Sequence, residues 1–204
     1  MAGMAGAIAT SVPSRHWPAP AAGEWTVDML AELPDDGRRY ELLDGVLLVS
    51  PSPVPNHQLT VTNLLRLLDA ALPPDHRALV APLDWQPDDR TSLVPDLLVV
   101  SRADYRPRKS LEALTVVVEV ASPSTARIDR TAKRDRYAQG GIAQYWIVDP
   151  GIGRDAVPSV TVYDLGADGY REAARAEGDQ QVTVALPVPG AEPVTLSPQQ
   201  LLEF

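Results

Sequence analysis

The chain has no cysteine among its 204 residues, so neither a disulfide nor a thiolate metal site can form. This absence suits a reducing cytoplasm, where we expect the protein to act. No apolar run approaches the roughly 18 residues of a transmembrane helix, so we expect no membrane partner. The first twenty residues lack a basic start and a compact apolar core. We therefore interpret residues 1–22 as a flexible tail rather than a signal peptide, followed by one domain over 23–204.

Basic residues are scarce and unevenly distributed. The formal net charge is −9, which argues against a nonspecific nucleic-acid coat. Half of the 18 Lys and Arg residues nevertheless fall within residues 101–140, together with only five acidic residues. This basic island could face a phosphate backbone, or it could be a solvated helix face that pairs with acids elsewhere. Charge alone leaves both interpretations open.

The first half of the chain predicts a hairpin, helices and two strands. Asp44-Gly45 lies between two apolar runs, which is typical of a type I′ turn with positive φ at both positions. Asn56 is expected to cap a helix that begins at His57 and ends before Pro73. We also expect a short helix over 27–33, strands over 78–81 and 93–100, a polar turn-rich segment over 82–92 and a basic loop over 101–114.

The second half predicts a strand, a helix and another strand. Residues 116–120 form a buried strand, and Ser122-Pro123 then offers a capping hydroxyl and a proline for the first helical turn. The helix is expected to end at Gly140, before a strand over 144–148. Such a short unit favours a right-handed crossover between parallel strands. Peripheral strands over 160–165, 182–186 and 194–196 and a short C-terminal helix complete the prediction.

Glu119 is the most informative residue, because it lies inside the apolar run from Thr115 to Ala121. Glutamate is almost never fully buried unless it is paired or bound to a metal. Asp96 opens a second apolar run, and two carboxylates on neighbouring strands would repel each other without a cation. Mg²⁺, or Mn²⁺ in its place, would remove that repulsion and could activate water for phosphodiester hydrolysis.

Lys133 is the best candidate for a lysine beside such a cation. Asp129, Lys133 and Tyr137 recur at i, i+4 and i+8, which places them on one face of the expected helix. A lysine there could orient water and offset negative charge in the transition state. Glu41, on the expected hairpin, could complete the metal shell or order a water molecule.

Each candidate also has an interpretation without chemistry. Asp96 follows a proline and could simply end a turn, and Lys133 could be a solvated helix residue. Glu41 could pair only with a neighbouring arginine such as Arg38 or Arg39. The remaining polar and aromatic positions are more often structural: His57 as a hydrogen-bonded residue near a helix start, Tyr137 and Trp146 as core residues, and Asp129 as the i, i+4 partner of Lys133.

An ordered set of short motifs resembles a known family. The motifs are Tyr40-Glu-Leu-Leu-Asp-Gly45, Pro-x-x-x-His57-Gln, Pro95-Asp96, Val-Glu119-Val, Ser122-Pro-Ser-Thr, then Asp129, Lys133 and Tyr137, and finally Tyr145-Trp-Ile-Val-Asp-Pro150. In this order they resemble the Uma-type family of putative restriction endonucleases, a branch of the PD-(D/E)XK nuclease superfamily. The resemblance covers roughly residues 25–150.

The resemblance implies both a fold and a reaction. The fold is α/β (α+β), a restriction-endonuclease-like mixed sheet flanked by helices, here with an extra N-terminal hairpin and C-terminal strands. The reaction is cleavage of DNA, with Mg²⁺ at Asp96 and Glu119 and with Glu41 as an auxiliary acid. The third position of the (D/E)XK triplet is Ala121, so Lys133 would supply the catalytic lysine instead. Nucleases of this superfamily often act as dimers, so the resemblance is compatible with a homodimer, and these residues leave the oligomeric state open.

Two other functions fit the same residues. A nuclease-fold module that binds nucleic acid or a protein without cutting would account for the net charge of −9 and for Ala121. A hydrolase of a smaller phosphoester would need no extended groove. In the main hypothesis, by contrast, the basic loop contacts DNA phosphates through Arg102, Arg106, Arg108 and Lys109.

Overall fold

The structure, a computed structural model, describes residues 20–204 except 22, 51, 106–109, 123–124 and 152–155. The predicted N-terminal tail falls almost entirely on residues 1–19 and 22, which lie outside the described residues. The same holds for Arg106, Arg108 and Lys109 of the basic loop. In the part of the chain that the structure describes, no helix is both long and apolar enough to cross a membrane.

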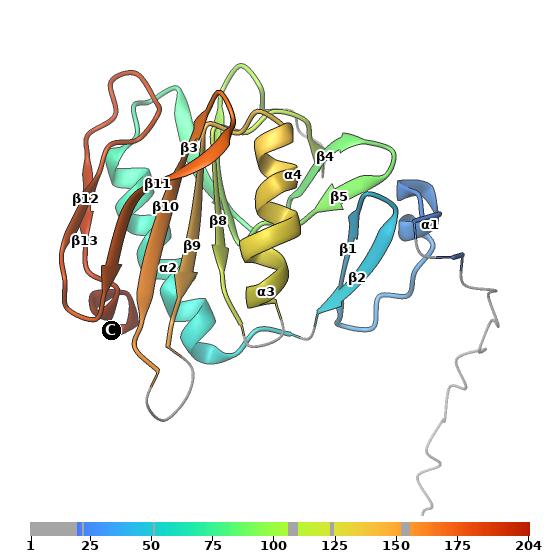
Figure 1. Cartoon of the computed structure of the whole chain (residues 1–204), viewed down its shortest axis with the longest axis horizontal. Coiled ribbons are helices and arrows are strands. Elements are labelled where there is room, and N and C mark those ends of the chain that lie inside the picture. The colour runs from blue at the N-terminus through green and yellow to red at the C-terminus, as the bar shows by residue number, and fades with distance from the viewer. Residues whose placement is uncertain (1–19, 22, 51, 106–109, 123–124, 152–155) are drawn as a thin grey trace, which may run out of the picture.

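A six-stranded mixed sheet forms the centre of the fold, with its strands in the order β11, β10, β9, β8, β6 and β3 (Figure 1). The strands are β3 (His76–Val80), β6 (Leu97–Ser101), β8 (Val116–Val120), β9 (Gln144–Asp149), β10 (Ser159–Gly166) and β11 (Gly169–Glu177). β8 and β9 are parallel, and the other neighbouring pairs are antiparallel. The predicted helical crossover between parallel strands is therefore confirmed.

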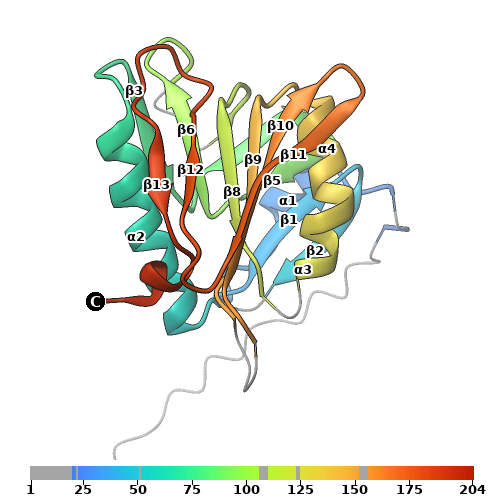
Figure 2. The same cartoon turned by 60° about the vertical axis from the view of Figure 1, so that its left-hand side comes forward.

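Alternating side chains give this sheet two apolar faces. On β8, Val116, Val118 and Val120 join a core that includes residues of α2 (Pro55–Ala71), whereas Val117 joins a second core on the other face. Successive strand residues point to opposite faces, so Glu119 projects to the second face with Val117. That face is covered by one continuous helical segment, made of α3 (Ala126–Ile128), the π-helical turn η1 (Asp129–Lys133) and α4 (Arg134–Gln139) (Figure 2).

A second sheet of five strands lies on the same side as α4, in the order β2, β1, β5, β4 and β7 (Figure 2). Its strands are β1 (Arg39–Leu43), β2 (Val46–Ser50), β4 (Asp84–Asp88), β5 (Thr91–Leu93) and β7 (Ser110–Leu111), and α1 (Val27–Ala31) precedes them. The predicted β1–β2 hairpin is confirmed, with φ of 49° at Asp44 and 79° at Gly45. The turn-rich segment 82–92 proves to contain β4 and the first two residues of β5, which the sequence did not predict.

Two predicted boundaries were wrong for local reasons. α2 begins at Pro55, so Asn56 lies inside its first turn instead of capping it. Proline suits this first position because no intrahelical N–H bond is needed there. The strand expected over 93–100 is two strands, because β5 ends at Leu93 in the small sheet and β6 begins at Leu97 in the large one.

The C-terminal strands were predicted only in part. β10, β12 (Val182–Val184) and β13 (Val194–Leu196) match the expected segments, and the C-terminal helix is the 3-10 helix η2 (Gln199–Leu202). The nine-residue strand β11 was missed, because its sequence Arg171-Glu-Ala-Ala-Arg-Ala176 consists of good helix formers. Antiparallel pairing with β10 along its length overrides that weak local preference.

Gly140 ends α4 directly against the indole of Trp85. Trp85 is fully buried and packs on Tyr137 with ring centroids 5.1 Å apart. A Cβ atom at Gly140 would overlap the indole ring. We therefore expect Gly140→Ala to lower the free energy of unfolding by about 1–3 kcal/mol, the usual cost of overpacking a core.

Urea unfolding of Gly140→Ala and Gly166→Ala would check this expectation. Gly166 is the matched control, because a Cβ there would approach its nearest neighbour, the side chain of Arg171, at an ordinary 3.4 Å. Equal unfolding free energies for the two variants would show that the indole ring moves aside without cost.

Candidate active site

Two acidic side chains lie opposite each other where β6 and β8 pair. Leu97 is opposite Val118 in this antiparallel ladder, and one further step in the same register places Asp96 opposite Glu119. Opposed residues of antiparallel strands have Cβ atoms about 4.5–5.5 Å apart and on the same face. Both residues are only 3% exposed. The sheet therefore brings the two predicted metal ligands together on the face that carries the π-helical turn.

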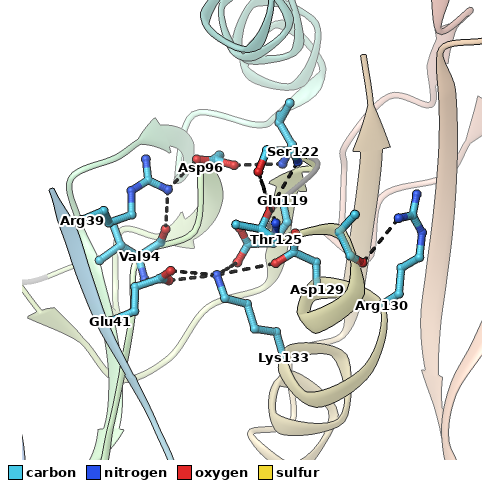
Figure 3. Close-up of polar contacts among 12 residues, drawn as sticks. Arg39, Glu41, Val94, Asp96, Glu119, Ser122, Thr125, Asp129, Arg130 and Lys133 are labelled. Atoms are coloured by element: carbon cyan, nitrogen blue, oxygen red, sulfur yellow. Dashed lines mark hydrogen bonds and ion pairs between the residues drawn. The ribbon is translucent and has the colours of Figure 1, made fainter. Parts of the chain in front are cut away.

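Asp96 accepts hydrogen bonds at both carboxylate oxygens (Figure 3). Arg39 donates to Oδ1 at 2.7 Å, and the Val120 N–H donates to Oδ2 at 2.9 Å. Nε2 of His57 also lies 3.1 Å from Oδ2. Burial alone would raise the pKa of Asp96, but the contacts with His57 and Arg39 hold this pKa below its ordinary value. Asp96 is therefore an ionised carboxylate.

Lys133 joins three carboxylates in a buried network (Figure 3). Its Nζ donates to Glu41 Oε1 at 2.9 Å, to Glu41 Oε2 at 3.1 Å and to Glu119 Oε1 at 3.1 Å. Asp129 Oδ1 lies 3.7 Å away. Burial alone would lower the pKa of Lys133, but the three carboxylates raise it above its ordinary value. Lys133 is thus a buried ammonium, which excludes the solvated interpretation, and Glu41 pairs with it and not with a neighbouring arginine.

Glu119 sits where a negative charge is hard to accommodate. Burial raises its pKa well above the ordinary value; Lys133 opposes this shift, and Asp129, Asp96 and Glu41 reinforce it. Tyr137 donates to Oε1 at 2.7 Å, so its hydroxyl takes part in the site while its ring packs in the core. Tyr137 and Lys133 both donate a hydrogen bond to Oε1 of Glu119, whereas no described residue donates one to Oε2 of Glu119.

The π-helical turn η1 aligns the residues that the helix contributes. In an α-helix with 3.6 residues per turn, residues spaced by four drift by about 40° at each step. A π turn, with its i→i+5 hydrogen bonds, holds more residues and so reduces this drift between Asp129 and Lys133. The hydroxyl of Tyr145, on β9, donates a hydrogen bond to the main-chain oxygen of Asp129 at 3.0 Å. This bond anchors the π turn to the six-stranded sheet. Single π turns of this kind frequently occur at functional sites.

These side chains line a cavity of about 280 Å³. The residues that connect β2 to α2 form another part of its wall, including Ser52, Pro53 and Val54. The ionisable side chains of the lining are Arg39, Glu41, His57, Asp96, Glu119, Asp129 and Lys133. All four residues predicted to be catalytic therefore open onto one space.

The donor set of this cavity fits a hydrated divalent cation. Four acids (Asp96, Glu119, Glu41 and Asp129) share the wall with two permanent cations (Arg39 and Lys133), so full ionisation leaves an excess of negative charge. Over the described residues, no three or more His, Asp or Glu side chains are grouped so that they could hold a metal ion by themselves. Mg²⁺ needs no such group, because it usually binds one or two carboxylates and keeps waters and substrate phosphates as its other ligands.

Arg102 lies far from this cavity. It follows β6 at the end opposite Asp96, about 20 Å away at roughly 3.3 Å per strand residue. Its side chain is exposed and borders a separate hollow with His76, Arg77 and Tyr105. The structure therefore does not bring Arg102 to the acidic residues, and its contact with DNA stays a prediction.

Part of the basic island pairs with acids on the protein itself. Arg130 lies 3.2 Å from Asp149, and Arg136 lies 3.0 Å from Asp44 and also contacts Asp88. These pairs support the interpretation that this portion of the island pairs with acids elsewhere on the protein, although the side chain of Arg136 is largely buried and only that of Arg130 is solvated.

Two residues of the site were missed or undervalued by sequence reasoning. Arg39 was considered only as a partner of Glu41, although residues at i and i+2 of a strand point to the same side, which was a usable signal. His57 was given a structural role, and its contact with Asp96 depends on how α2 packs against the sheet. Periodicity within one helix carries no information about that packing.

Comparison with known proteins identifies both a family and a fold. The family model Uma2, described as "Putative restriction endonuclease", matches residues 27–198. A solved structure, that of a "putative nuclease belonging to DUF820" from Anabaena variabilis ATCC 29413, is 21% identical with a TM-score of 0.69. The match covers 87% of this chain and 97% of that one, and at this identity it shows the fold alone. No curated protein matches the chain.

Proposed function

The chain belongs to the Uma2 family of putative restriction endonucleases, and on that basis we propose that it is a metal-dependent endonuclease that hydrolyses DNA phosphodiester bonds. The family match agrees with the resemblance in the sequence motifs. The observation that carries the proposal is the pairing of Asp96 with Glu119 on adjacent strands, beside a lysine bonded to Glu119.

In this proposal each charged residue has a distinct task. Asp96 and Glu119 would hold Mg²⁺, or Mn²⁺ in its place, and that cation would supply charge neutralisation at the phosphate and a more acidic water. Lys133 keeps a permanent positive charge beside Glu119 and offsets the charge that develops on the phosphate in the transition state. Glu41 fixes Lys133 with both carboxylate oxygens and is itself held by the Val94 N–H at 2.9 Å.

The buried acids support an enzyme over a module that only binds. Buried carboxylates are costly even when they are paired, because their desolvation offsets much of the attraction between the partners. A protein that only binds DNA would gain nothing from four acids in one cavity, since they would repel phosphates. A phosphodiesterase needs such a cavity to hold the cation.

We expect the purified protein to nick supercoiled plasmid DNA in Mg²⁺ or Mn²⁺ and to leave it intact in EDTA. A single-stranded oligonucleotide and the small diester bis(p-nitrophenyl) phosphate, assayed in parallel, would separate strand preference from hydrolysis of small phosphoesters. Nicking that persists in EDTA would rule out the metal requirement. If no substrate is turned over with either metal, the result favours a binding module, or a substrate or partner absent from the assay, over the proposed endonuclease.

A further inference from the structure

The two carboxylate oxygens of Asp96 are held by very different partners. Oδ2 faces the main-chain N–H of Val120, 2.9 Å away, and Nε2 of His57, 3.1 Å away. Both partners are buried and belong to the packed elements β8 and α2. Among the described residues, Oδ1 has a single partner, Nη1 of Arg39 at 2.7 Å (Figure 3). The fold therefore fixes Oδ2, whereas the environment of Oδ1 depends on one side chain.

Arg39 is the most exposed charged residue of this network. Its side chain is 26% exposed, whereas those of Asp96, Glu119 and Lys133 are exposed by 4% or less. Arg39 also donates through Nη1 to the Val94 carbonyl, at 3.3 Å. Both bonds use the same nitrogen, and among the described residues no partner is found for Nε or Nη2. A guanidinium carries five N–H donors, so most of its bonding capacity remains available.

Lys133 has no comparable set of N–H donors available for a ligand. An ammonium has three N–H donors, and the oxygens of Glu41 and Glu119 accept three hydrogen bonds from it. A phosphate that entered the cavity could bond to Lys133 only by displacing a buried carboxylate. Among the described residues of the cavity wall, Arg39 is thus the cationic side chain with donors left for a ligand.

We propose that Arg39 binds the substrate phosphate and that its ion pair with Asp96 is exchanged when a divalent cation binds. Oδ1 of Asp96 then belongs to the cation, and the guanidinium turns from Asp96 to the phosphate. One oxygen cannot serve both positive groups at close range without strong repulsion between them. A guanidinium also matches two phosphate oxygens at once, which an ammonium cannot do. This inference rests on the proposed function and adds a phosphate-binding residue to it.

Arg39→Gln tests both halves of the exchange, with Arg38→Gln as the matched control. Arg38 carries the same charge one position earlier, and it pairs with Asp36 at 3.5 Å outside the cavity. Calorimetric titration with Mn²⁺ alone should show Arg39→Gln binding at least about threefold tighter than wild type, because a competing positive charge is gone. Arg38→Gln should bind Mn²⁺ like wild type.

Binding of a short fluorescent DNA duplex then tests the phosphate contact. In EDTA, the difference in duplex affinity between wild type and Arg39→Gln should be smaller than in Ca²⁺, because the charge of Arg39 is still paired with Asp96. In Ca²⁺, with intact DNA verified on a gel, wild type should bind about tenfold tighter than Arg39→Gln, as expected for one charge-assisted contact. If Arg39→Gln does not stay folded, as monitored by circular dichroism, Arg39→Lys takes its place, since it keeps the charge but loses the two-pronged contact.

The outcomes separate this inference from the proposed function. Weaker Mn²⁺ binding by Arg39→Gln would show that Arg39 supports Asp96 and does not compete with the cation, which overturns the exchange. Equal DNA affinity of Arg39→Gln and Arg38→Gln in Ca²⁺ would overturn the phosphate contact. A wild-type protein that binds no Mn²⁺ and cleaves no DNA would overturn the proposed function itself, and that result needs no variant.

Discussion

Glu119→Gln is expected to reduce DNA cleavage by at least roughly a thousandfold while the protein stays folded. A carboxylate that holds the cation contributes several kcal/mol to the transition state, and each 1.36 kcal/mol corresponds to a factor of ten in rate. Glutamine keeps the size of the side chain and an oxygen that can accept the bond from Tyr137. Because burial raises the pKa of Glu119, its charged form is unfavourable there, and a neutral side chain should be tolerated.

Asp96→Asn provides the informative contrast. It should abolish cleavage to the same extent, but it should also destabilise the protein by about 1–3 kcal/mol, because it weakens hydrogen bonds to a charged group. The pKa of Asp96 is held below its ordinary value, so its ionised form is the favoured one in the fold. Glu119→Gln should thus reduce activity without reducing stability, whereas Asp96→Asn should reduce both.

Plasmid nicking in Mg²⁺ and urea unfolding would measure the two effects separately. Glu172→Gln is the matched control, because Glu172 is an exposed acid on β11. If Glu119→Gln nicks DNA at more than about a tenth of the wild-type rate, the loss is under 1.4 kcal/mol and Glu119 does not hold the cation.

Lys133→Met should lower the free energy of unfolding by about 3–5 kcal/mol, because it leaves buried acids without their compensating charge. Lys133 is 2% exposed and contacts Glu41, Glu119 and Asp129. Methionine retains an unbranched apolar chain, so the loss reflects charge more than volume. Adding Glu41→Gln in the same protein should recover part of the stability, since one buried acid is then removed.

Urea unfolding of the single and double variants would measure this coupling. Arg130→Met is a suitable control from the same helical segment, because its side chain is 45% exposed and its ion pair with Asp149 should contribute less than about 1 kcal/mol. A similarly small loss for Lys133→Met would mean that the acids do not depend on Lys133, and the network would need a different explanation.

The features predicted correctly from the sequence are those that short stretches of chain determine. The Asp44-Gly45 turn, the strand over 116–120 and the end of the helix at Gly140 each depend on a few neighbouring residues. The side on which Glu119 projects follows from strand alternation, once its apolar neighbours define the core face. The close approach of Asp96 and Glu119 was also predicted, because the two residues were expected on neighbouring strands.

The features that were missed depend on contacts between distant segments. β4 includes Pro87 and begins and ends with aspartate, so its sequence suggests a turn, but Trp85 is fully buried and the strand pairs with β5. Such pairing routinely outweighs intrinsic strand preference. The contact of Arg39 with Asp96 spans 57 positions, and no local pattern specifies it.

The position of the lysine could be predicted, but its surroundings could not. Ala121 is 2% exposed and belongs to the core on the second face, and its N–H donates to Val148 at 2.7 Å. A lysine at this position would need space that the core does not offer. Lys133 reaches Glu119 from the helix instead, and the π turn that aligns it leaves no recognisable sequence signal.

The site is divided between two sheets, and this division affects when it forms during folding. Arg39 and Glu41 belong to the five-stranded sheet, whereas Glu119 belongs to the six-stranded sheet and Asp96 directly precedes one of its strands. The bond between Glu41 and Lys133 closes a loop of 92 positions, and contacts of such long range are slow to form. No partly folded chain with only one of the sheets contains the whole site, so activity would report completion of the tertiary structure.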